Sequence, residues 1–358
     1  MWLNVGMDPG KVETLPSTRC EDADSVAAQV VGDGVAKTVA AGYFRRGMAS
    51  FVGGDVDAIF DLASLTKPMT AVAFVKAKLS PEAPLGWFLP ELRGTSAGEV
   101  PIELFFAHRS GVPAHLSLFA PLLEGRTVDA ADALMIAALS RAELPDGHDE
   151  HAPVYSDTGY ILAGVALARA VGARDAGEAI EELVSRPLGL RDVLGTARGL
   201  RSRADFDARV VPTEIVAFRG GEVRGAVHDE NAWALTGSGG SGHAGMFGTL
   251  GAVLAFAHHT LDLGEDAEWL FRPRKSGTQL AGFDGKSSEG SSAGEVLGHR
   301  TYGHLGFTGT SFWVDPALGV GVSLLTNRVH PTRENPKIRA ARPRAHDALA
   351  RLALSKTR

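Results

Sequence analysis

The sequence predicts an α+β fold in which an antiparallel β-sheet is flanked by helices and a mostly helical lobe is inserted into the chain. Three observations lead to this prediction. Strand-like runs occur within residues 1–66, helical periodicity dominates from 67 to about 172, and residues 299–326 alternate like strands before a closing helix. A chain of 358 residues is long enough to bury a large core as one domain or two joined lobes. We therefore expect one unit (1–358) of two lobes, an α/β lobe of residues 1–66 and 168–358 and a helical lobe of residues 67–167.

The N-terminal segment is predicted to form a loose arm followed by a hairpin. Residues 1–25 are polar and interrupted by proline and glycine. The runs 26–31 and 35–44 are rich in β-forming residues and flank the turn sequence Gly32-Asp33-Gly34, which is typical of a hairpin. A further short strand is expected to end at Leu62.

Helical spacing between proline-containing loops predicts the elements of the inserted block. The expected helices are 66–79, 102–108, 130–140, 158–171 and 177–185. Beyond them we expect short strands at 214–218 and 222–226, a helix capped by Thr249 that runs to His259, and an exposed Gly/Ser-rich loop at 272–297. The last elements are the strands 299–307, 310–315 and 320–326 and a helix over 337–354.

Composition excludes several classes of function. The net charge of -6 and the pI near 6.1 argue against nucleic-acid binding, and the basic run 339–344 is interpreted as a solvated helix face. The single cysteine, Cys20, excludes an internal disulfide framework and a cysteine-based zinc site. No apolar run approaches the roughly 18 residues of a membrane span, and the first residues do not resemble a signal peptide. The sequence as written therefore predicts a cytoplasmic protein that binds no membrane, and export stays open if the start is misassigned.

A serine and a lysine three residues apart, Ser64 and Lys67, stand where a strand-like run meets a predicted helix. Residues three apart on a helix share a face, so the hydroxyl and the amine can meet. A lysine desolvated in an apolar pocket loses proton affinity and is able to take the serine proton, which makes Ser64 a candidate nucleophile. The S-x-x-K pattern alone is weak, because such a lysine is often an ordinary solvated side chain. Its setting strengthens it, since Val72, Val75 and Leu79 follow at helical spacing.

A tyrosine and an aspartate, Tyr155 and Asp157, mark a second candidate segment at a loop-to-helix junction. Two residues apart on an extended segment, they point the same way, so both can face a cleft. Tyr155 is then a candidate acid/base group, with a pKa lowered by a nearby Lys67 ammonium. The alternative is a buried tyrosine that packs against a helix start, with Asp157 as the N-cap.

A glycine-rich stretch from Tyr302 to Thr310 contains His304 and Gly306 on a predicted strand. Glycine inside a strand often marks the close approach of a ligand or of another backbone segment. Backbone N–H groups at this position are able to stabilise a developing oxyanion, together with the N–H of Ser64 at the mouth of its helix. A bulge or tight turn in an edge strand is the alternative.

Three motifs of the penicillin-recognising serine hydrolases resemble segments of this chain in the same order: Ser64-Leu-Thr-Lys67, Tyr155-Ser-Asp157 and His304-Leu-Gly306. Within this family, the chain most resembles the class C β-lactamases, the esterases related to them and the DD-peptidases. The resemblance extends over roughly residues 26–355. It implies a β-lactamase/transpeptidase-like fold with the active site between the two lobes.

The resemblance also implies roles for the motif residues. Ser64 would be the acylated nucleophile, with Lys67 as its base or as the charge that tunes the base. Tyr155 would protonate the leaving group and later help to activate the deacylating water. Substrate contacts would come from Asp157, His304, Gly306 and Phe307, and the oxyanion hole from the amides of Ser64 and Phe307.

Two departures from the motifs bear on the substrate. Asp157 replaces the usual asparagine, and His304-Leu305-Gly306 replaces Lys-Thr-Gly. His304 is a cation only when protonated, Leu305 offers no hydroxyl, and Asp157 adds negative charge. A neutral ester or a cation-bearing substrate is therefore expected to fit better than a strongly anionic β-lactam.

The expected function is a serine hydrolase that acts on small esters, amides or peptide-like compounds without a cofactor or metal ion. A DD-peptidase or weak β-lactamase is the second hypothesis, and a non-catalytic ligand-binding module on the same fold is the third. The oligomeric state is not predicted.

Other polar clusters receive structural interpretations. The glycine-rich run 237–245 lacks the ending of a phosphate loop and is expected near the cleft rim. His228, Asp229, Glu230 and His243 match no metal-ligand spacing, and His108 and His115 are expected to cap or pack rather than to catalyse.

Overall fold

The computed structural model of the protein describes residues 17–144, 150–202 and 205–356, so the predicted arm lies mostly outside the described residues. Within them, seven strands form the main sheet in the order β1-β3-β2-β12-β11-β10-β9. All neighbours pair antiparallel except β1 and β3, which are parallel. The strands are β1 (Ser17–Arg19), β2 (Val39–Arg45), β3 (Ser50–Gly54), β9 (Asp284–Gly285), β10 (Tyr302–Leu305), β11 (Ser311–Asp315) and β12 (Val320–Thr326).

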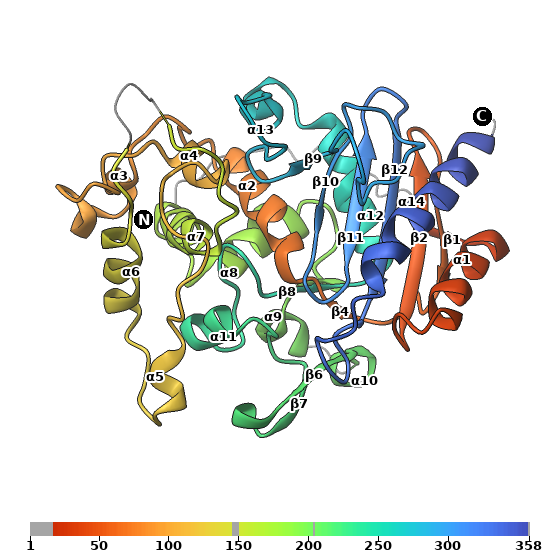
Figure 1. Ribbon diagram of the computed structural model, residues 1–358, viewed down its shortest axis with the longest axis horizontal. Coiled ribbons are helices and arrows are strands. Elements are labelled where there is room, and N and C mark those ends of the chain that lie inside the picture. Colours follow the sequence, from red (N-terminus) through yellow and green to blue (C-terminus); the bar gives the residue numbers. More distant parts are fainter. Residues whose placement is uncertain (1–16, 145–149, 203–204, 357–358) are drawn as a thin grey trace.

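Helices cover both faces of this sheet. On one face α1 (Glu21–Gly32) and α14 (Ile338–Ser355) lie beside each other (Figure 1), and on the other lies α12 (Leu250–His259). The strands alternate accordingly, since Val322 and Leu324 pack with α1 and α14 while Leu325 packs with α12. Gly42 on β2 lets α12 approach closely, because a Cβ there would lie 3.0 Å from Leu254 Cδ1. The sheet is thus buried on both sides.

The predicted N-terminal hairpin is wrong in its first half, because residues 26–31 lie inside α1. The helix begins after Cys20, whose sulfur accepts the N–H of Ala23, and acidic residues occupy its first turn. Ala23, Ala27 and Val30 follow at helical spacing and are buried. The β-forming residues of the run therefore lie in a helix, one face of which packs on β2 and β3.

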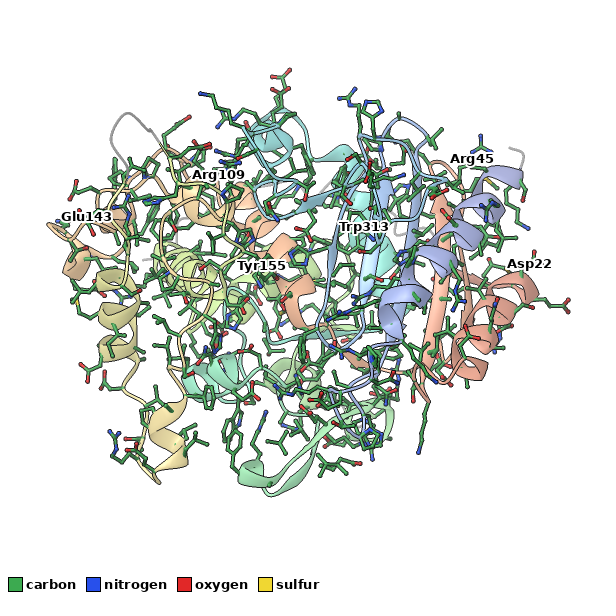
Figure 2. All side chains as sticks on the ribbon, viewed as in Figure 1. Asp22, Arg45, Arg109, Glu143, Tyr155 and Trp313 are labelled. Atoms are coloured by element: carbon green, nitrogen blue, oxygen red, sulfur yellow. The ribbon has the colours of Figure 1, made fainter. Side chains whose placement is uncertain are left out.

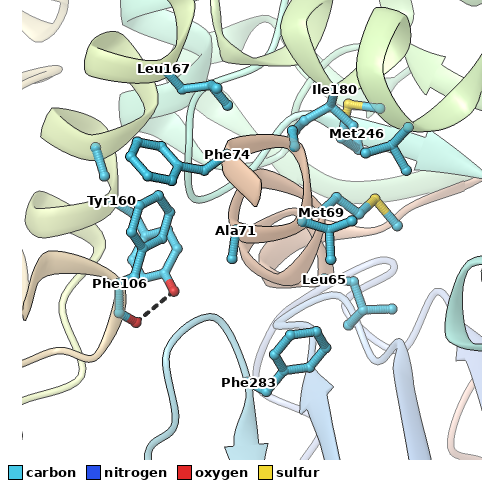
Figure 3. Packing of buried hydrophobic residues seen from close by; sticks show 14 of the residues in the cluster. Leu65, Met69, Ala71, Phe74, Phe106, Tyr160, Leu167, Ile180, Met246 and Phe283 are labelled. Carbon is cyan, nitrogen blue, oxygen red and sulfur yellow. Dashed lines mark hydrogen bonds between the residues drawn. The ribbon is translucent and has the colours of Figure 1, made fainter. Parts of the chain in front are cut away.

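The helix α2 (Thr66–Lys76), which follows Ser64, crosses the centre of the molecule. Nearly every side chain along it is buried, so it is a core helix rather than an amphipathic surface helix. Figure 3 shows Met69 and Phe74 of α2 among side chains from the surrounding helices, where Tyr160 donates a hydrogen bond of 2.8 Å to the carbonyl of Phe106. The helices on this side of the molecule are α3 (Leu85–Phe88), α4 (Ile102–Phe106), α5 (Ala120–Leu123), α6 (Ala130–Leu139), α7 (Asp157–Val171) and α8 (Ala176–Ile180).

A smaller sheet connects this helical part to the main sheet, in the order β4 (Phe60–Asp61), β8 (Met246–Gly248) and β5 (Leu194–Thr196). The short strands predicted at 214–218 and 222–226 are present, shifted by one or two residues, as β6 (Pro212–Val216) and β7 (Gly221–Arg224), which pair antiparallel. The predicted cap is also present, since Thr249 accepts the N–H of Ala252 at the start of α12. The other helices are α9 (Ala197–Arg201), α10 (Phe206–Arg209), α11 (Glu230–Thr236) and α13 (Glu268–Phe271).

The expected exposed loop at 272–297 is only partly exposed. It contains β9 and buries Ala281, Phe283, Ala293 and Leu297. The α+β fold with a helix-flanked sheet is confirmed, and the lobe boundaries at 66/67 and 167/168 stay a prediction. No helix in the described part of the chain is both long and apolar enough to span a membrane.

Candidate active site

The turn that carries Ser64 is short and held by a buried carboxylate. Asp61, at the end of β4, is 2% exposed and accepts the N–H of Ala63 at 2.8 Å and the N–H of His228 at 2.7 Å. Ala63 has a φ of 47°, a left-handed conformation that non-glycine residues adopt only under tertiary constraint. This turn places Ser64 directly before α2.

The same turn is attached to the hairpin between β10 and β11. Thr308 Oγ1 donates to the carbonyl of Asp61 at 2.8 Å, and Thr310 Oγ1 donates to the carbonyl of Leu62 at 3.0 Å. Gly306 lies at the contact, since a Cβ there would lie 2.0 Å from Thr310 Oγ1 and 2.7 Å from the Leu62 carbonyl oxygen. The predicted strand 299–307 is shorter, so Phe307 lies in the turn after β10. The candidate nucleophile and this turn are thus fixed relative to each other.

We expect Gly306→Ala to lower the free energy of unfolding by about 1–3 kcal/mol, because the methyl group overlaps atoms that join the two segments. Ester hydrolysis should fall with it, since the Ser64 and Phe307 segments would move apart. Urea denaturation and steady-state kinetics check this expectation. Gly32→Ala is the matched control, because no heavy atom beyond its own helix lies within 4 Å of the added methyl group, and it should lower neither quantity. A Gly306→Ala protein with unchanged free energy of unfolding and unchanged ester hydrolysis would contradict the tight contact.

Lys67 is fully buried and joins two residues of the site. Its Nζ donates to Ser64 Oγ at 3.0 Å and to Asp157 Oδ1 at 2.6 Å, and it lies 4.6 Å from the centre of the Tyr155 ring. Burial by itself lowers the pKa of Lys67, but the contacts with Asp157 and Tyr155 together outweigh burial, so the pKa lies above its ordinary value. The prediction of a desolvated lysine with lowered proton affinity is therefore wrong, because that prediction omitted the ion pair.

Tyr155 lies near the middle of the molecule, where the helical part meets the sheet (Figure 2). Burial raises its pKa, and the opposing effect of the Lys67 ammonium is too small to reverse this. The predicted lowered pKa is thus wrong, and the free protein carries a neutral phenol. The Tyr155 ring stacks on His108 with 4.6 Å between ring centres and lies 6.0 Å from the ring of His304.

Asp157 is the first residue of α7, and the N-cap of that helix is Ser156 rather than Asp157. Ser156 Oγ accepts the N–H of Gly159 at 2.9 Å. The Asp157 carboxylate is therefore free to pair with Lys67. Burial raises the pKa of Asp157, yet the positive charge of Lys67 outweighs burial and leaves the pKa below its ordinary value.

A cavity of about 480 Å³ opens beside Ser64. The predicted residues Tyr155, Asp157, Gly306 and Phe307 line it, whereas Lys67 and His304 do not. The N–H groups of Ser64 and Phe307 donate to no acceptor within the residues that the structure describes, so both are available to a ligand oxygen. The other lining residues are Ala63, His115, His228, Asp229, Glu230, Ala244, Leu305, Arg328, Arg333, Arg339 and Arg342.

Comparison with known proteins decides the family. A family model described as Beta-lactamase matches residues 19–346. The chain belongs to the β-lactamase family. The N-acetylmuramyl-L-alanine amidase of Bacillus subtilis (strain 168) is 28% identical over 318 residues, which are 78% of this chain and 71% of the relative. A putative D-alanyl-D-alanine carboxypeptidase of Salmonella agona (strain SL483) is 25% identical over 325 residues, 78% of this chain and 72% of the relative.

The fold of this β-lactamase-family chain is similar to that of a solved class C β-lactamase from Rhodobacter sphaeroides. The two share a TM-score of 0.68 at 17% sequence identity, over 94% of this chain and 100% of that one. At this identity the similarity concerns the fold. The family is one of hydrolases with several kinds of substrate, so the activity class follows from the family while the substrate does not.

His304 differs from the lysine of the family's Lys-Thr-Gly motif in residue type, and it is also deeply buried. It is 1% exposed, and burial lowers its pKa, so its ring is neutral at neutral pH. Its Nδ1 lies 2.9 Å from the carbonyl oxygen of Leu305. A direct contact with substrate stays a prediction for this residue.

The arginines of this β-lactamase-family site were missed by the sequence analysis. The basic run 339–344 was interpreted as a solvated face, but Arg342 is 9% exposed and lines the cavity together with Arg339. Residues three apart share a helix face, which was the available signal. Arg328 was not noticed, and it donates through Nε and Nη2 to the carbonyl of Phe307 at 2.9 and 2.6 Å.

Two histidines of the region, His228 and His243, are paired with carboxylates, whereas His115 is exposed at the cavity. His228 lies 3.0 Å from Glu214 and His243 lies 2.8 Å from Asp229. Among the described residues, no three side chains of metal-ligating type form a group able to hold an ion. His108 packs as expected, and its Nδ1 accepts the N–H of Ser156 at 2.9 Å.

Proposed function

We propose that this β-lactamase-family hydrolase forms an acyl-enzyme on Ser64 and acts on small esters or amides. The observation that carries the proposal is the hydrogen-bonded series Asp157, Lys67, Ser64, which ends at a cavity with two free backbone N–H groups. A hydroxyl in hydrogen-bond contact with a base that a third group orients is the general arrangement of an activated nucleophile. The cavity volume of about 480 Å³ suits a small substrate.

The charge state of Lys67 determines the order of proton transfers. As an ammonium it has no lone pair, so it must first lose a proton to solvent. The neutral amine then accepts the Ser64 proton while Oγ bonds to the acyl carbon. Tyr155, a neutral phenol in the free protein, gives its proton to the leaving alcohol or amine and regains one from the Lys67 ammonium. All protons balance, and Ser64 is left acylated.

The amides of Ser64 and Phe307 are the proposed oxyanion hole. Developing negative charge on the acyl oxygen is stabilised by preorganised N–H donors, and removal of one such donor typically costs about 10²–10³ in kcat. The rigid attachment of the Phe307 turn to the Ser64 turn supports this role, because preorganisation requires fixed donors.

A second candidate function is a peptidase for substrates that end in a carboxylate. Arg328, Arg339 and Arg342 line one part of the cavity without a carboxylate partner among the described residues, whereas Arg333 is paired with Glu214 and Glu230. Their charge counters the expectation that anionic substrates fit poorly. The carboxypeptidase name of the Salmonella relative agrees with this candidate.

A substrate panel distinguishes these functions. We expect p-nitrophenyl acetate to give a burst of p-nitrophenol equal to the concentration of active sites, followed by slower turnover. Nitrocefin and an N-acylated D-alanyl-D-alanine peptide test the other activities. The same peptide with a C-terminal amide is the matched control for carboxylate recognition. Faster release of D-alanine than of p-nitrophenol, lost on amidation, would favour the peptidase. Binding without any burst would contradict catalysis and favour a ligand-binding module.

A further inference from the structure

Arg342 is a buried cation that the proposed reaction does not yet use. It lies on α14, which packs on the sheet, and no carboxylate of the described residues pairs with it. Burial lowers its pKa to about 9, and the nearby charge of Arg328 acts in the same direction. Burying a charge without a counterion is costly, so its hydrogen-bond partners indicate what its charge acts on.

The partners of Arg342 are two carbonyls of the turn between β10 and β11. Its Nη2 donates to the carbonyl of Gly306 at 2.7 Å and to the carbonyl of Thr310 at 2.8 Å. The same two residues already pair with each other, since the Gly306 N–H donates to the Thr310 carbonyl at 2.7 Å. One guanidinium nitrogen therefore bridges the two ends of the turn and fixes its shape.

The carbonyl of Gly306 and the N–H of Phe307 belong to the same peptide group. A cation that donates to the carbonyl withdraws electron density from that peptide and makes its N–H a stronger donor, as in other polarised chains of hydrogen bonds. We propose that Arg342 is a positioning residue for the oxyanion hole, which orients and polarises the Gly306–Phe307 peptide so that the Phe307 N–H stabilises the tetrahedral intermediate. The inference rests on the proposed acylation of Ser64.

Arg328 contacts Phe307 on its C-terminal side, at the Phe307 carbonyl. It donates to the carbonyl of Phe307 at 2.9 and 2.6 Å, and its guanidinium lies 4.7 Å from the centre of the Phe307 ring. The position of the Phe307 N–H is thus set by two arginines that reach it from different segments. Of the two arginines, Arg342 is the one that contacts the carbonyl of the peptide that supplies the N–H, so it is the variant to test. The N–H of Gly309 donates to the same carbonyl at 3.0 Å and is unchanged in that variant.

The test compares Arg342→Met, Arg342→Lys and Arg344→Met. Methionine keeps much of the aliphatic volume and removes the charge, whereas lysine keeps the charge. Arg344 is the matched control, because it lies on the same helix but is exposed and paired with Asp33. Each variant is assayed with the neutral substrate p-nitrophenyl acetate, and inhibition by an arylboronic acid, which forms a tetrahedral adduct on serine, is measured in parallel.

For Arg342→Met we expect kcat to fall about 10–30-fold with KM nearly unchanged, a part of the effect of removing a whole oxyanion donor. Affinity for the boronic acid should fall by the same factor, Arg342→Lys should recover part of both, and Arg344→Met should match the wild type. If circular dichroism shows that Arg342→Met is unfolded, the test uses Arg342→Lys instead. The proposal then predicts that kcat falls in this variant while KM stays nearly unchanged.

Other outcomes overturn the proposal. If Arg342→Met loses activity only toward carboxylate-bearing substrates, or if only its KM rises, Arg342 is a substrate-binding residue. Unchanged kinetics and boronic acid affinity in Arg342→Met would exclude any role in the oxyanion hole. A wild-type protein that never acylates Ser64 would instead refute the proposed function itself, and that result is separate because it involves no Arg342 variant.

Discussion

Replacing Ser64 by alanine is expected to lower kcat/KM for p-nitrophenyl esters by at least about 10⁴-fold, the scale seen when a serine nucleophile is removed from a hydrolase. The physical reason is that the other hydroxyl beside Lys67, that of Tyr155, cannot replace the Ser64 hydroxyl as the nucleophile. The nearest alternative donor of the site, Tyr155, is a neutral phenol with a raised pKa and is a poor nucleophile. Residual hydrolysis would then reflect the free N–H groups and the cavity alone.

Steady-state kinetics with the wild type, Ser64→Ala and Ser25→Ala measures this effect. Ser25 is the matched control, because it is an exposed serine on α1, on the far side of the sheet from α12. The control should match the wild type. Full activity in Ser64→Ala would refute covalent catalysis at this residue, and equal losses in both variants would point to a defect unrelated to the site.

The second large effect is expected from Asp157→Asn. The Asp157 carboxylate, 2.6 Å from Lys67 Nζ, holds the pKa of the lysine above its ordinary value. An opposite charge at this range typically shifts a pKa by about 1–3 units. Since Lys67 must lose a proton before it can act as a base, the variant should move the rising limb of the pH profile of kcat/KM to lower pH by about one unit or more. Activity near pH 7 should rise about tenfold for each unit of that shift.

The same substitution should reduce stability over a defined range of pH. Asp157 has a lowered pKa in the folded protein, so its contribution is present above the unfolded value of 3.8 and is lost as pH falls through the folded value. Lys67 has a raised pKa, so its contribution is present below 10.5 and is lost as pH rises through the folded value. The ion pair therefore stabilises the fold across the neutral range. Asp157→Asn should unfold at lower urea concentration at pH 7 and converge with the wild type only toward the extremes of pH.

Glu230→Gln is the matched control for Asp157→Asn. Glu230 also lines the cavity, but its carboxylate pairs with Arg333 rather than with Lys67. Its pH profile should superimpose on that of the wild type. A rising limb that stays in place in Asp157→Asn would contradict the view that the protonation of Lys67 limits the reaction.

The sequence was sufficient to predict the elements whose patterns are local. The strands β11 and β12 are runs rich in β-forming residues separated by a turn, and Thr249 has the chemistry of a cap, so these elements were expected within a residue or two. The run that became α1 was misassigned because its β-branched residues favour a strand in isolation. The acidic first turn and the helical spacing of Ala23, Ala27 and Val30 were the overlooked signals.

The residues that surround Ser64 were predicted from their order along the chain, but their charge states were not. Spacing indicates that Ser64 and Lys67 share a helix face, yet it says nothing about a carboxylate ninety residues further on. The raised pKa values of Lys67 and Tyr155 depend on burial and on the contact with Asp157, which only the three-dimensional structure provides. The structure brings Lys67 together with Ser64, Asp157 and Tyr155, as the sequence analysis expected, but the expected pKa directions of Lys67 and Tyr155 were wrong.

The arginines were missed for a related reason, because the spacing that puts Arg339 and Arg342 on one helix face does not say which face is buried. Arg342 lies in a basic run whose composition is typical of solvated surface, and its neighbour Arg344 is indeed exposed. Helical geometry turns Arg342 in the opposite direction, toward the carbonyls of Gly306 and Thr310. Which face of α14 meets the sheet is set by packing with β2 and β12, and that information is not local to the run.

The central claim, acylation of Ser64, is tested most directly by mass spectrometry of the intact protein after exposure to a fluorophosphonate and to short-chain activated esters. We predict one covalent adduct per chain, located on the peptide that contains Ser64 and absent in Ser64→Ala, with an acyl-enzyme of the ester's acyl mass at short times. Complete ester turnover with no adduct on Ser64, or labelling that persists in Ser64→Ala, would contradict the claim.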